Sequence, residues 1–140
     1  MLLSDAVSYA TDNRRSVLIT LRRDGRPQSS NVMHVVTDGT FEVSVTDSRA
    51  KTRNVRRDSR VSLHVSAQDF WSYVVVDGTA ETLPVAQHPD DATADALVRY
   101  YRAAAGEHPD WDEYRRVMVE EQRLLLRITP QRAYGMLPRG

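Results

Sequence analysis

The strongest local signal for the fold lies in Asp38-Gly39-Thr40-Phe41-Glu42-Val43-Ser44-Val45. Asp-Gly is a strong signal for the two-residue turn of a β-hairpin, because both central positions of that turn favour a positive φ. After the turn, Phe41, Val43 and Val45 alternate with polar residues, which is the pattern of a strand with one buried face. The stretch therefore predicts an antiparallel sheet in this part of the chain.

Strand patterns continue on both sides of this hairpin. Residues 16–22 are β-branched and partly alternating, and residues 28–37 resume as a strand after the turn residues Asp24-Gly25-Arg26-Pro27. Residues 61–65 alternate again, and residues 70–80 predict a long strand. Strands that follow one another at such short spacing are typical of a barrel or a sandwich.

The second half of the chain changes to a helical period. Pro89-Asp90-Asp91 supplies a proline and two acids for a first helical turn, and the apolar spacing that follows stops at Gly106. Pro109-Asp110-Trp111-Asp112 predicts the start of a second helix in the same way. A short helix is also expected over residues 4–13.

A last strand is predicted over residues 123–129, and residues 133–135 prolong it. The sequence shows no internal repeat, linker or low-complexity run. We therefore expect one α+β domain over residues 1–140, mainly β, in which a late strand returns to a barrel built from a meander.

The composition argues against several classes of protein. The chain carries 19 basic and 19 acidic residues, whereas a general nucleic-acid binder has a broad basic excess. No run of about 18 uncharged apolar residues predicts a membrane span. There are no cysteines, which excludes disulfides and thiolate chemistry. Residues 1–6 lack the pattern of a signal peptide, so we expect a cytoplasmic protein without nucleic-acid or membrane partners.

The common catalytic and cofactor motifs are missing from the sequence. His34, His64, His88 and His108 have no metal-ligand spacing, so no metal site is predicted. The sequence contains no G-x-S-x-G elbow, no G-x-G-x-x-G fingerprint and no P-loop. The sequence therefore gives no motif support for a serine hydrolase, a Rossmann-fold protein or a P-loop nucleoside triphosphatase.

The segment 48–58 is strongly basic and lies between two predicted strands. Five basic residues occur in the nine positions from Arg49 to Arg57, and Lys51 is the only lysine in the chain. If Asp47 or Ser48 caps a short helix here, the free amides of its first turn would lie among these cations. The segment is either an anion cradle for a phosphorylated cofactor or a solvated basic helix face.

Two further segments allow both a functional and a structural interpretation. Residues 25–32 place small polar side chains on a strand, which suits either a flat ligand or an ordinary edge strand; Asn31 can donate and accept hydrogen bonds there. Residues 69–73 concentrate aromatic side chains, with Trp71 and Tyr73 expected on one strand face. Such aromatics occur in cores and subunit interfaces as well as in ligand sites.

Several separate blocks of sequence occur together in one order. They are Asp24-Gly25-Arg26-Pro27-Gln28, Ser30-Asn31-Val32, Arg49-Ala50-Lys51-Thr52-Arg53-Asn54, Trp71-Ser72-Tyr73, Tyr101-Arg102, Ala105-Gly106-Glu107-His108 and Asp110-Trp111. In these blocks the chain resembles the flavin-binding split barrels related to pyridoxamine 5′-phosphate oxidase, over nearly its whole length. More narrowly, it resembles the actinobacterial branch that uses the deazaflavin coenzyme F420.

The resemblance implies a split β-barrel of the FMN-binding type with peripheral helices. It also implies a homodimer in which two cofactor sites lie across the interface. Arg49, Lys51 and Thr52 would hold the cofactor phosphate, and Trp71 would approach the ring from the same or the partner subunit. The full set of expected cofactor-binding residues is Gln28, Ser30, Asn31, Val32, Ser44, Val45, Arg49, Ala50, Lys51, Thr52, Arg53 and Trp71.

The expected function is an F420-dependent oxidoreductase that transfers hydride from the reduced deazaflavin to a small unsaturated substrate. The protein would mainly orient and shield the cofactor. Tyr73, His34 or solvent could each donate a proton, and no residue is predicted to be catalytic. Two alternatives remain open: an FMN-dependent oxidase or reductase on the same barrel, and a flavin or F420 carrier or sensor without turnover. For F420, Arg56 and Arg57 are candidate contacts of its carboxylate-bearing tail.

Overall fold

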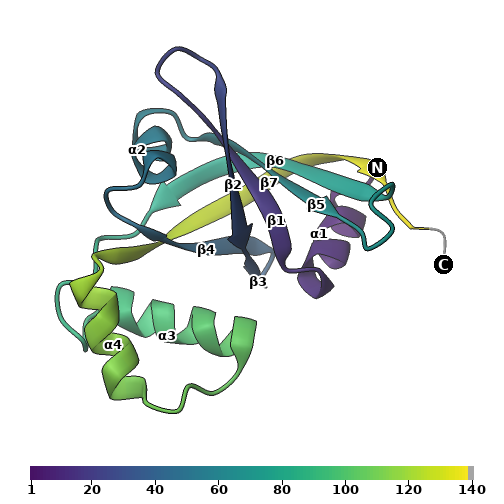
Figure 1. The fold of residues 1–140 in the computed structure, drawn as a ribbon. Helices are drawn as coiled ribbons and strands as arrows, with labels where there is room; N and C mark the ends of the chain where they lie inside the picture. The colour runs from purple at the N-terminus through teal and green to yellow at the C-terminus, as the bar shows by residue number, and fades with distance from the viewer. Residues whose placement is uncertain (139–140) are drawn as a thin grey trace.

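A computed structural model describes residues 1–138 and contains one antiparallel sheet of seven strands that curls into a split barrel (Figure 1). The sheet order is β2-β1-β5-β6-β7-β4-β3. The strands are β1 (Arg15–Leu21), β2 (Pro27–Met33), β3 (Val35–Thr37), β4 (Thr40–Thr46), β5 (Arg60–Ser66), β6 (Tyr73–Thr82) and β7 (Arg123–Met136). The predicted mainly β fold is confirmed, including the late strand that returns to the meander.

The predicted hairpin at Asp38-Gly39 forms in the structure. Asp38 and Gly39 have φ values of 50° and 77° and join β3 to β4. Both positions therefore have the positive φ that Asp-Gly hairpin turns adopt. In β4, Phe41, Val43 and Val45 are buried at 0%, 1% and 1% exposure, so their alternation places one face in the core.

The core of the barrel is built from the inward-facing rows of the sheet. Leu18 of β1 pairs with Leu63 of β5, and Leu63 pairs with Val76 of β6, so the three side chains share one face. All three are fully buried. Helix α1 (Leu3–Asp12) adds Ala6 and Ala10 to this cluster, because small side chains let the helix lie close to the sheet.

The helices α3 (Ala92–Ala105) and α4 (Trp111–Glu120) form a hairpin between β6 and β7, drawn in green in Figure 1. They pack around Leu125, which points away from the barrel core. The carboxylates of Asp91 and Asp110 cap the two helices by accepting from the amides of Ala94 and Glu113. Both helices form as predicted, but they begin at Ala92 and Trp111, so the prolines expected in their first turns precede the N-caps.

Three further expectations about strands and helices differ from the structure. The strand expected over residues 28–37 breaks at His34, whose buried ring bonds to two other elements, so β2 and β3 are separate. The strand expected from residue 70 begins at Tyr73, because Phe70 has a φ of 71° and lies in a turn. The basic segment forms α2 (Ala50–Arg57), but its N-cap is Arg49 and no side chain caps it.

Residues 1–138 include no helix that has both the length and the apolar character needed to cross a membrane.

Candidate functional site

Helix α2 carries the basic segment and follows directly from β4. Its first turn is fixed by Thr52, which is fully buried and donates a hydrogen bond from Oγ1 to the Thr46 carbonyl at 2.8 Å. The amides of Ala50 and Lys51 have no acceptor inside the helix, since no helical carbonyl precedes them. The start of α2 therefore presents backbone donors and the positive end of the helix dipole to an anion. The expected contact between Thr52 and a cofactor remains a prediction, and the Thr52 hydroxyl is already engaged.

Lys51 lies close to two other cations. Partial burial lowers the pKa of Lys51, and the neighbouring guanidinium groups of Arg49 and Arg123 lower it further. Like charges held together disfavour one another, and an anion bound among them relieves that repulsion. The three side chains, together with the first amides of α2, form the anion seat of the candidate site.

Arg123 belongs to the anion seat although no sequence pattern singled it out. It is the first residue of β7 and pairs with Thr46, the last residue of β4. Its Nη1 donates to Ser44 Oγ at 3.4 Å, and its Nε pairs with Glu121 at 2.7 Å. Only the β4–β7 register brings this arginine to α2, so a correct prediction of that strand pair would have identified it.

A chain of hydrogen bonds joins α2 to the edge strand β2. Arg57 Nη2 donates to Asn54 Oδ1 at 2.9 Å, and Asn54 Nδ2 donates to Thr20 Oγ1 at 3.1 Å. Thr20 Oγ1 then donates to Gln28 Oε1 at 3.2 Å, and Gln28 Nε2 donates to Ser30 Oγ at 2.9 Å. The basic helix and the polar strand are therefore held in fixed relation to each other, as one site requires.

The expected ligand residues on β2 lie on both faces of the strand. Ser30 pairs with the buried Leu18, whereas Asn31 pairs with Val17, and successive side chains of a strand point to opposite faces. Gln28 and Val32 share the Ser30 face. Because β2 is at the edge of the sheet, its free backbone groups are also open to a ligand.

The two expected residues of β4 offer different groups to a ligand. Ser44 is partly exposed, and its hydroxyl accepts the bond from Arg123. The Val45 side chain is 1% exposed and lies in the barrel core. Any contact from Val45 to a cofactor must therefore come from its backbone.

Tyr100 of α3 bridges the split between β2 and β4. Its hydroxyl donates to the Met33 carbonyl at 2.7 Å, next to the end of β2. Burial raises the pKa of Tyr100, while the Ser44 backbone amide that bonds to the phenol oxygen and the charge of Arg123 oppose this rise. The helical hairpin is thereby tied to the same edge of the barrel as the anion seat.

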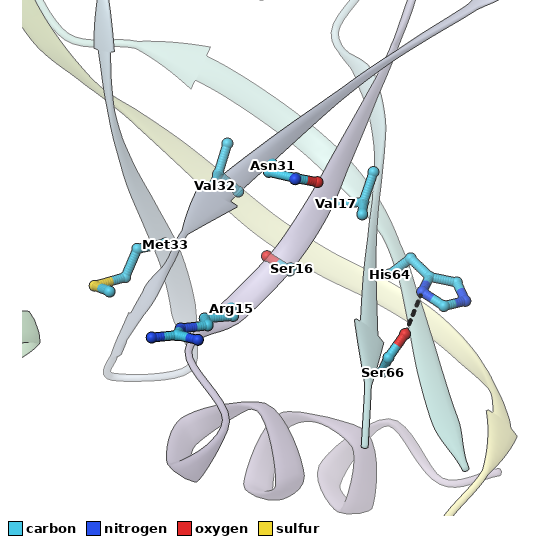
Figure 2. Close-up of a pocket in the computed structure, with 8 residues that line it drawn as sticks. All are labelled: Arg15, Ser16, Val17, Asn31, Val32, Met33, His64 and Ser66. Atoms are coloured by element: carbon cyan, nitrogen blue, oxygen red, sulfur yellow. Dashed lines mark hydrogen bonds between the residues drawn. The ribbon is translucent and has the colours of Figure 1, made fainter. Parts of the chain in front are cut away.

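An open groove of about 480 Å³ lies on the outer face of β2, β1 and β5. Its volume is within the range of small-molecule sites. Figure 2 shows Asn31 and Val17 between Arg15 on one side and His64 on the other, with Ser66 bonded to His64 Nδ1 at 3.4 Å. The lining residues are Arg15, Ser16, Val17, Asn31, Val32, Met33, His64 and Ser66.

Trp71 lies far from the anion seat of its own chain. It is 78% exposed in the turn between β5 and β6 and contacts Phe70 edge to face at 5.3 Å. Helix α2 precedes the opposite end of β5, whose seven residues span roughly 20 Å. The structure therefore separates Trp71 from Lys51 within one chain, and the expectation that Trp71 and Tyr73 share a strand face is wrong.

In residues 1–138 no group of three or more histidine or acidic side chains is arranged to hold a metal ion. The candidate site consists instead of cations, amides and small polar side chains. These groups suit the phosphate of a flavin-type cofactor, because guanidinium, ammonium and amide donors all favour oxyanions.

Comparison with solved structures supports the fold. An F420 reductase is 21% identical, with 91% of this chain and 94% of that chain aligned at a TM-score of 0.67. The conserved hypothetical protein Rv2991 from Mycobacterium tuberculosis is 22% identical, with 100% and 91% aligned at 0.73. The heme storage protein HutZ from Vibrio cholerae is 16% identical, with 97% and 96% aligned at 0.69.

The sequence itself matches one family model along almost its entire length. Residues 4–137 match the model described as pyridoxamine 5′-phosphate oxidase. The match contains β1 to β7, α2 and every residue expected at the cofactor site. Together with the split barrel, it establishes that this chain belongs to the pyridoxamine 5′-phosphate oxidase family.

Proposed function

We propose that this protein is an F420-dependent oxidoreductase that transfers hydride from reduced deazaflavin to a small unsaturated substrate. The observation that carries the proposal is the anion seat, in which Arg49, Lys51 and the first amides of α2 lie where β4 ends, opposite Arg123 of β7. Hydrogen bonds tie this seat to the polar edge strand β2. A phosphate site fixed beside an open strand edge fits a phosphorylated, flat cofactor.

The side chains of the site bind and orient rather than react. Arg49 and Lys51, with the amides of Ala50 and Lys51, would hold the cofactor phosphate, and Arg53 would lie outside them. Gln28, Ser30, Asn31 and Val32 would flank the ring, with the backbone of Ser44 and Val45. When bound, reduced F420 supplies the hydride, and the protein supplies its position and a shielded environment.

Neither His34 nor Tyr73 is well suited to donate a proton. His34 is 0% exposed, and its Nδ1 and Nε2 lie 2.8 Å from Ser16 Oγ and the Ala10 carbonyl. Tyr73 stacks on His64 with 5.2 Å between ring centroids, on the outer face of the sheet. We therefore assign proton transfer to solvent and propose no catalytic residue.

The proposal includes a homodimer with the cofactor sites at its interface. A row of paired residues crosses the outer face of five strands, from Asn31 through Val17, His64 and Val75 to Tyr134. Several apolar side chains on this face are exposed, including Met33 at 39%, Tyr134 at 54% and Met136 at 66%. A second copy would cover them and bring its own Trp71 toward the site.

Sedimentation equilibrium of the purified protein tests the proposed homodimer. A stable monomer at micromolar concentration would contradict it.

The decisive test is calorimetric titration of the cofactor-free protein with F420 and, in parallel, with FMN. We expect tight binding of F420 and weak binding of FMN. The opposite preference would move the protein to FMN-dependent chemistry. Binding of neither cofactor would overturn the proposed function and leave the fold unaffected.

A carrier or sensor that binds the cofactor without turnover is the second candidate. The observation that favours it is that neither of the two side chains considered as proton donors, His34 and Tyr73, is well placed for that role. The solved heme storage protein, which is similar in fold, also has a storage role. Stoichiometric binding of F420 together with no oxidation of the reduced cofactor across a panel of unsaturated compounds would favour this candidate.

Trp71 provides an optical test of the proposed interface. In a Trp111→Phe background, we expect F420 binding to quench the fluorescence of Trp71, because the partner's copy would lie beside the ring. Trp111 must be removed since it belongs to a separate cluster, where it bonds to Glu107 at 2.9 Å. Unchanged emission at saturating F420 would place Trp71 outside the cofactor site. A Trp71→Phe variant measured in parallel supplies the background signal.

A further inference from the structure

The barrel formed by residues 1–138 is open between β2 and β4, which are separated in the sheet by β1, β5, β6 and β7. Tyr100 of α3 spans this opening. Its hydroxyl donates to the carbonyl of Met33, the last residue of β2, at 2.7 Å, and the backbone amide of Ser44 in β4 lies close enough to interact with the same oxygen. We infer that Tyr100 is a positioning residue, which holds β2 and β4 at the spacing that receives the ring of the cofactor. The inference rests on the proposed function.

The bridge made by Tyr100 joins backbone positions on both sides of the proposed ring site. In the proposed function, Val32 flanks the ring from β2, and the backbone of Ser44 flanks it from β4. Met33 follows Val32 directly in the chain, so a change in spacing at Tyr100 would move both sides of the ring site. Arg123 of the anion seat donates to Ser44 Oγ at 3.4 Å, which ties the phosphate site to the same part of β4. The Tyr100 hydroxyl therefore lies where the width of the opening is set.

Helix α3 holds the Tyr100 ring in place independently of β2. The helix runs beside β3 and β4 (Figure 1). Leu97, which is one turn before Tyr100, is fully buried in the same apolar cluster as Leu125 of β7. Near the start of the helix, Thr93 Oγ1 donates to the Pro84 carbonyl at 2.7 Å. A side chain carried by a helix that is fixed at its start and middle is a more precise spacer than one on a loop.

The Tyr100 hydroxyl remains a hydrogen-bond donor at neutral pH. Burial raises the pKa of Tyr100, although the Ser44 amide and the charge of Arg123 act in the opposite direction. A tyrosine whose pKa lies above its ordinary value of about 10 is protonated throughout the neutral range. Only this protonated form can donate to the Met33 carbonyl. The bridge is therefore formed at the pH at which cofactor binding would be measured.

Tyr114 of α4 provides a matched control for Tyr100. Its hydroxyl donates to the Leu97 carbonyl at 2.9 Å, so both tyrosines make a bond from a phenol to a backbone carbonyl. Both partners of the Tyr114 bond belong to the helical hairpin. Tyr114→Phe and Tyr100→Phe each remove one hydroxyl, and each should lower the free energy of unfolding modestly, as urea unfolding would measure. Only Tyr100→Phe removes the link between β2 and β4.

The affinity for F420, measured by calorimetry, is the first test. Tyr100→Phe should weaken F420 binding by about 3- to 10-fold, the effect of one lost hydrogen bond. Tyr114→Phe should leave the affinity unchanged. Binding of inorganic phosphate, which needs only the anion seat, should be equal in the wild-type protein and both variants. An equal loss of F420 affinity in both variants would assign the effect to the stability of the helical hairpin and would overturn the role of Tyr100.

The mobility of the bound ring provides an independent measurement, which a purely structural role of Tyr100 would not change. A ring held between two fixed strands rotates with the protein, so the fluorescence of F420 at saturation should be strongly anisotropic. This anisotropy should fall in Tyr100→Phe, whereas the wild-type protein and Tyr114→Phe should give the same value. Unchanged anisotropy in Tyr100→Phe would overturn the inference, whatever the affinity, and would leave the proposed function intact.

The choice of cofactor separates the inference from the proposed function. If the wild-type protein binds FMN in place of F420, the proposed function fails, and the same anisotropy comparison with FMN tests Tyr100. If the wild-type protein binds neither cofactor, the proposed function and the positioning role of Tyr100 both fail.

Discussion

Lys51→Ala is expected to weaken cofactor binding by about 10- to 100-fold, since a hydrogen bond to a charged group is worth about 1.5–3 kcal/mol. Lys51 belongs to the anion seat, where Arg49 and Arg123 are near enough to lower its pKa. The Lys51→Ala variant removes one of the three cations of the seat, so binding of both F420 and FMN should weaken through their phosphates. Calorimetric titration of the variant measures the effect.

The same environment of Lys51 predicts how Lys51→Ala affects the stability of the cofactor-free protein. Burial and two like charges lower the pKa of Lys51, which means that the folded state disfavours its charge. Lys51→Ala should therefore leave the free energy of unfolding unchanged or slightly higher. The control is Lys51→Arg, which keeps the charge and should retain most of the affinity. A variant that unfolds, or a folded one with full affinity, would contradict the assignment of Lys51.

His34→Ala is expected to lower the free energy of unfolding by about 3 kcal/mol, as a cavity and two unpaired polar groups appear together. The ring is fully buried between Ser16 Oγ and the Ala10 carbonyl, each at 2.8 Å. It joins α1 to β1 at the point where β2 and β3 separate. Urea unfolding followed by circular dichroism measures the loss. His64→Ala is the matched control. Because His64 is only partly buried, this substitution should lower the free energy of unfolding much less.

The burial of His34 also predicts how the stability of the protein changes with pH. Burial is the main cause that lowers its pKa below the ordinary value, so the folded state binds a proton less readily than the unfolded state. Stability is then full above the ordinary histidine pKa of about 6.5 and is lost as the pH falls below it, toward the lowered value. His34→Gln cannot titrate, so its stability should fall less between neutral and mildly acidic pH. An equal fall in both proteins would assign the effect to other groups.

Local patterns in the sequence were sufficient for most of the fold. Alternation in residues 41–45 and 61–65 reflects burial of one strand face, and the helix starts reflect capping by Asp91 and Asp110. The family resemblance, rather than these patterns, identified the barrel as split. The breaks at His34 and Phe70 were missed because they depend on a buried ring and on a turn, which alternation does not report.

The site could be predicted only in part, for a related reason. Residues 49–53 are consecutive, so their clustering is visible in the sequence. Arg123 and Tyr100 reach the same place through strand register and helix packing, which join positions far apart in the chain. Ser30 and Asn31 are neighbours on a strand, so the sequence alone predicts that their side chains point to opposite faces. Which of the two faces the core depends on the pairing of β2 with β1.

The length of β7 has a consequence for how the protein is made. Its 14 residues pair with β4 through their first half and with β6 through most of their length. As the polypeptide leaves the ribosome, β4 and β6 expose unpaired edges until residues 123–136 have been synthesised. Barrel closure is therefore a late, non-local event that follows synthesis of α3 and α4, and until then the open edges of β4 and β6 are potential sites of edge-to-edge pairing between nascent chains.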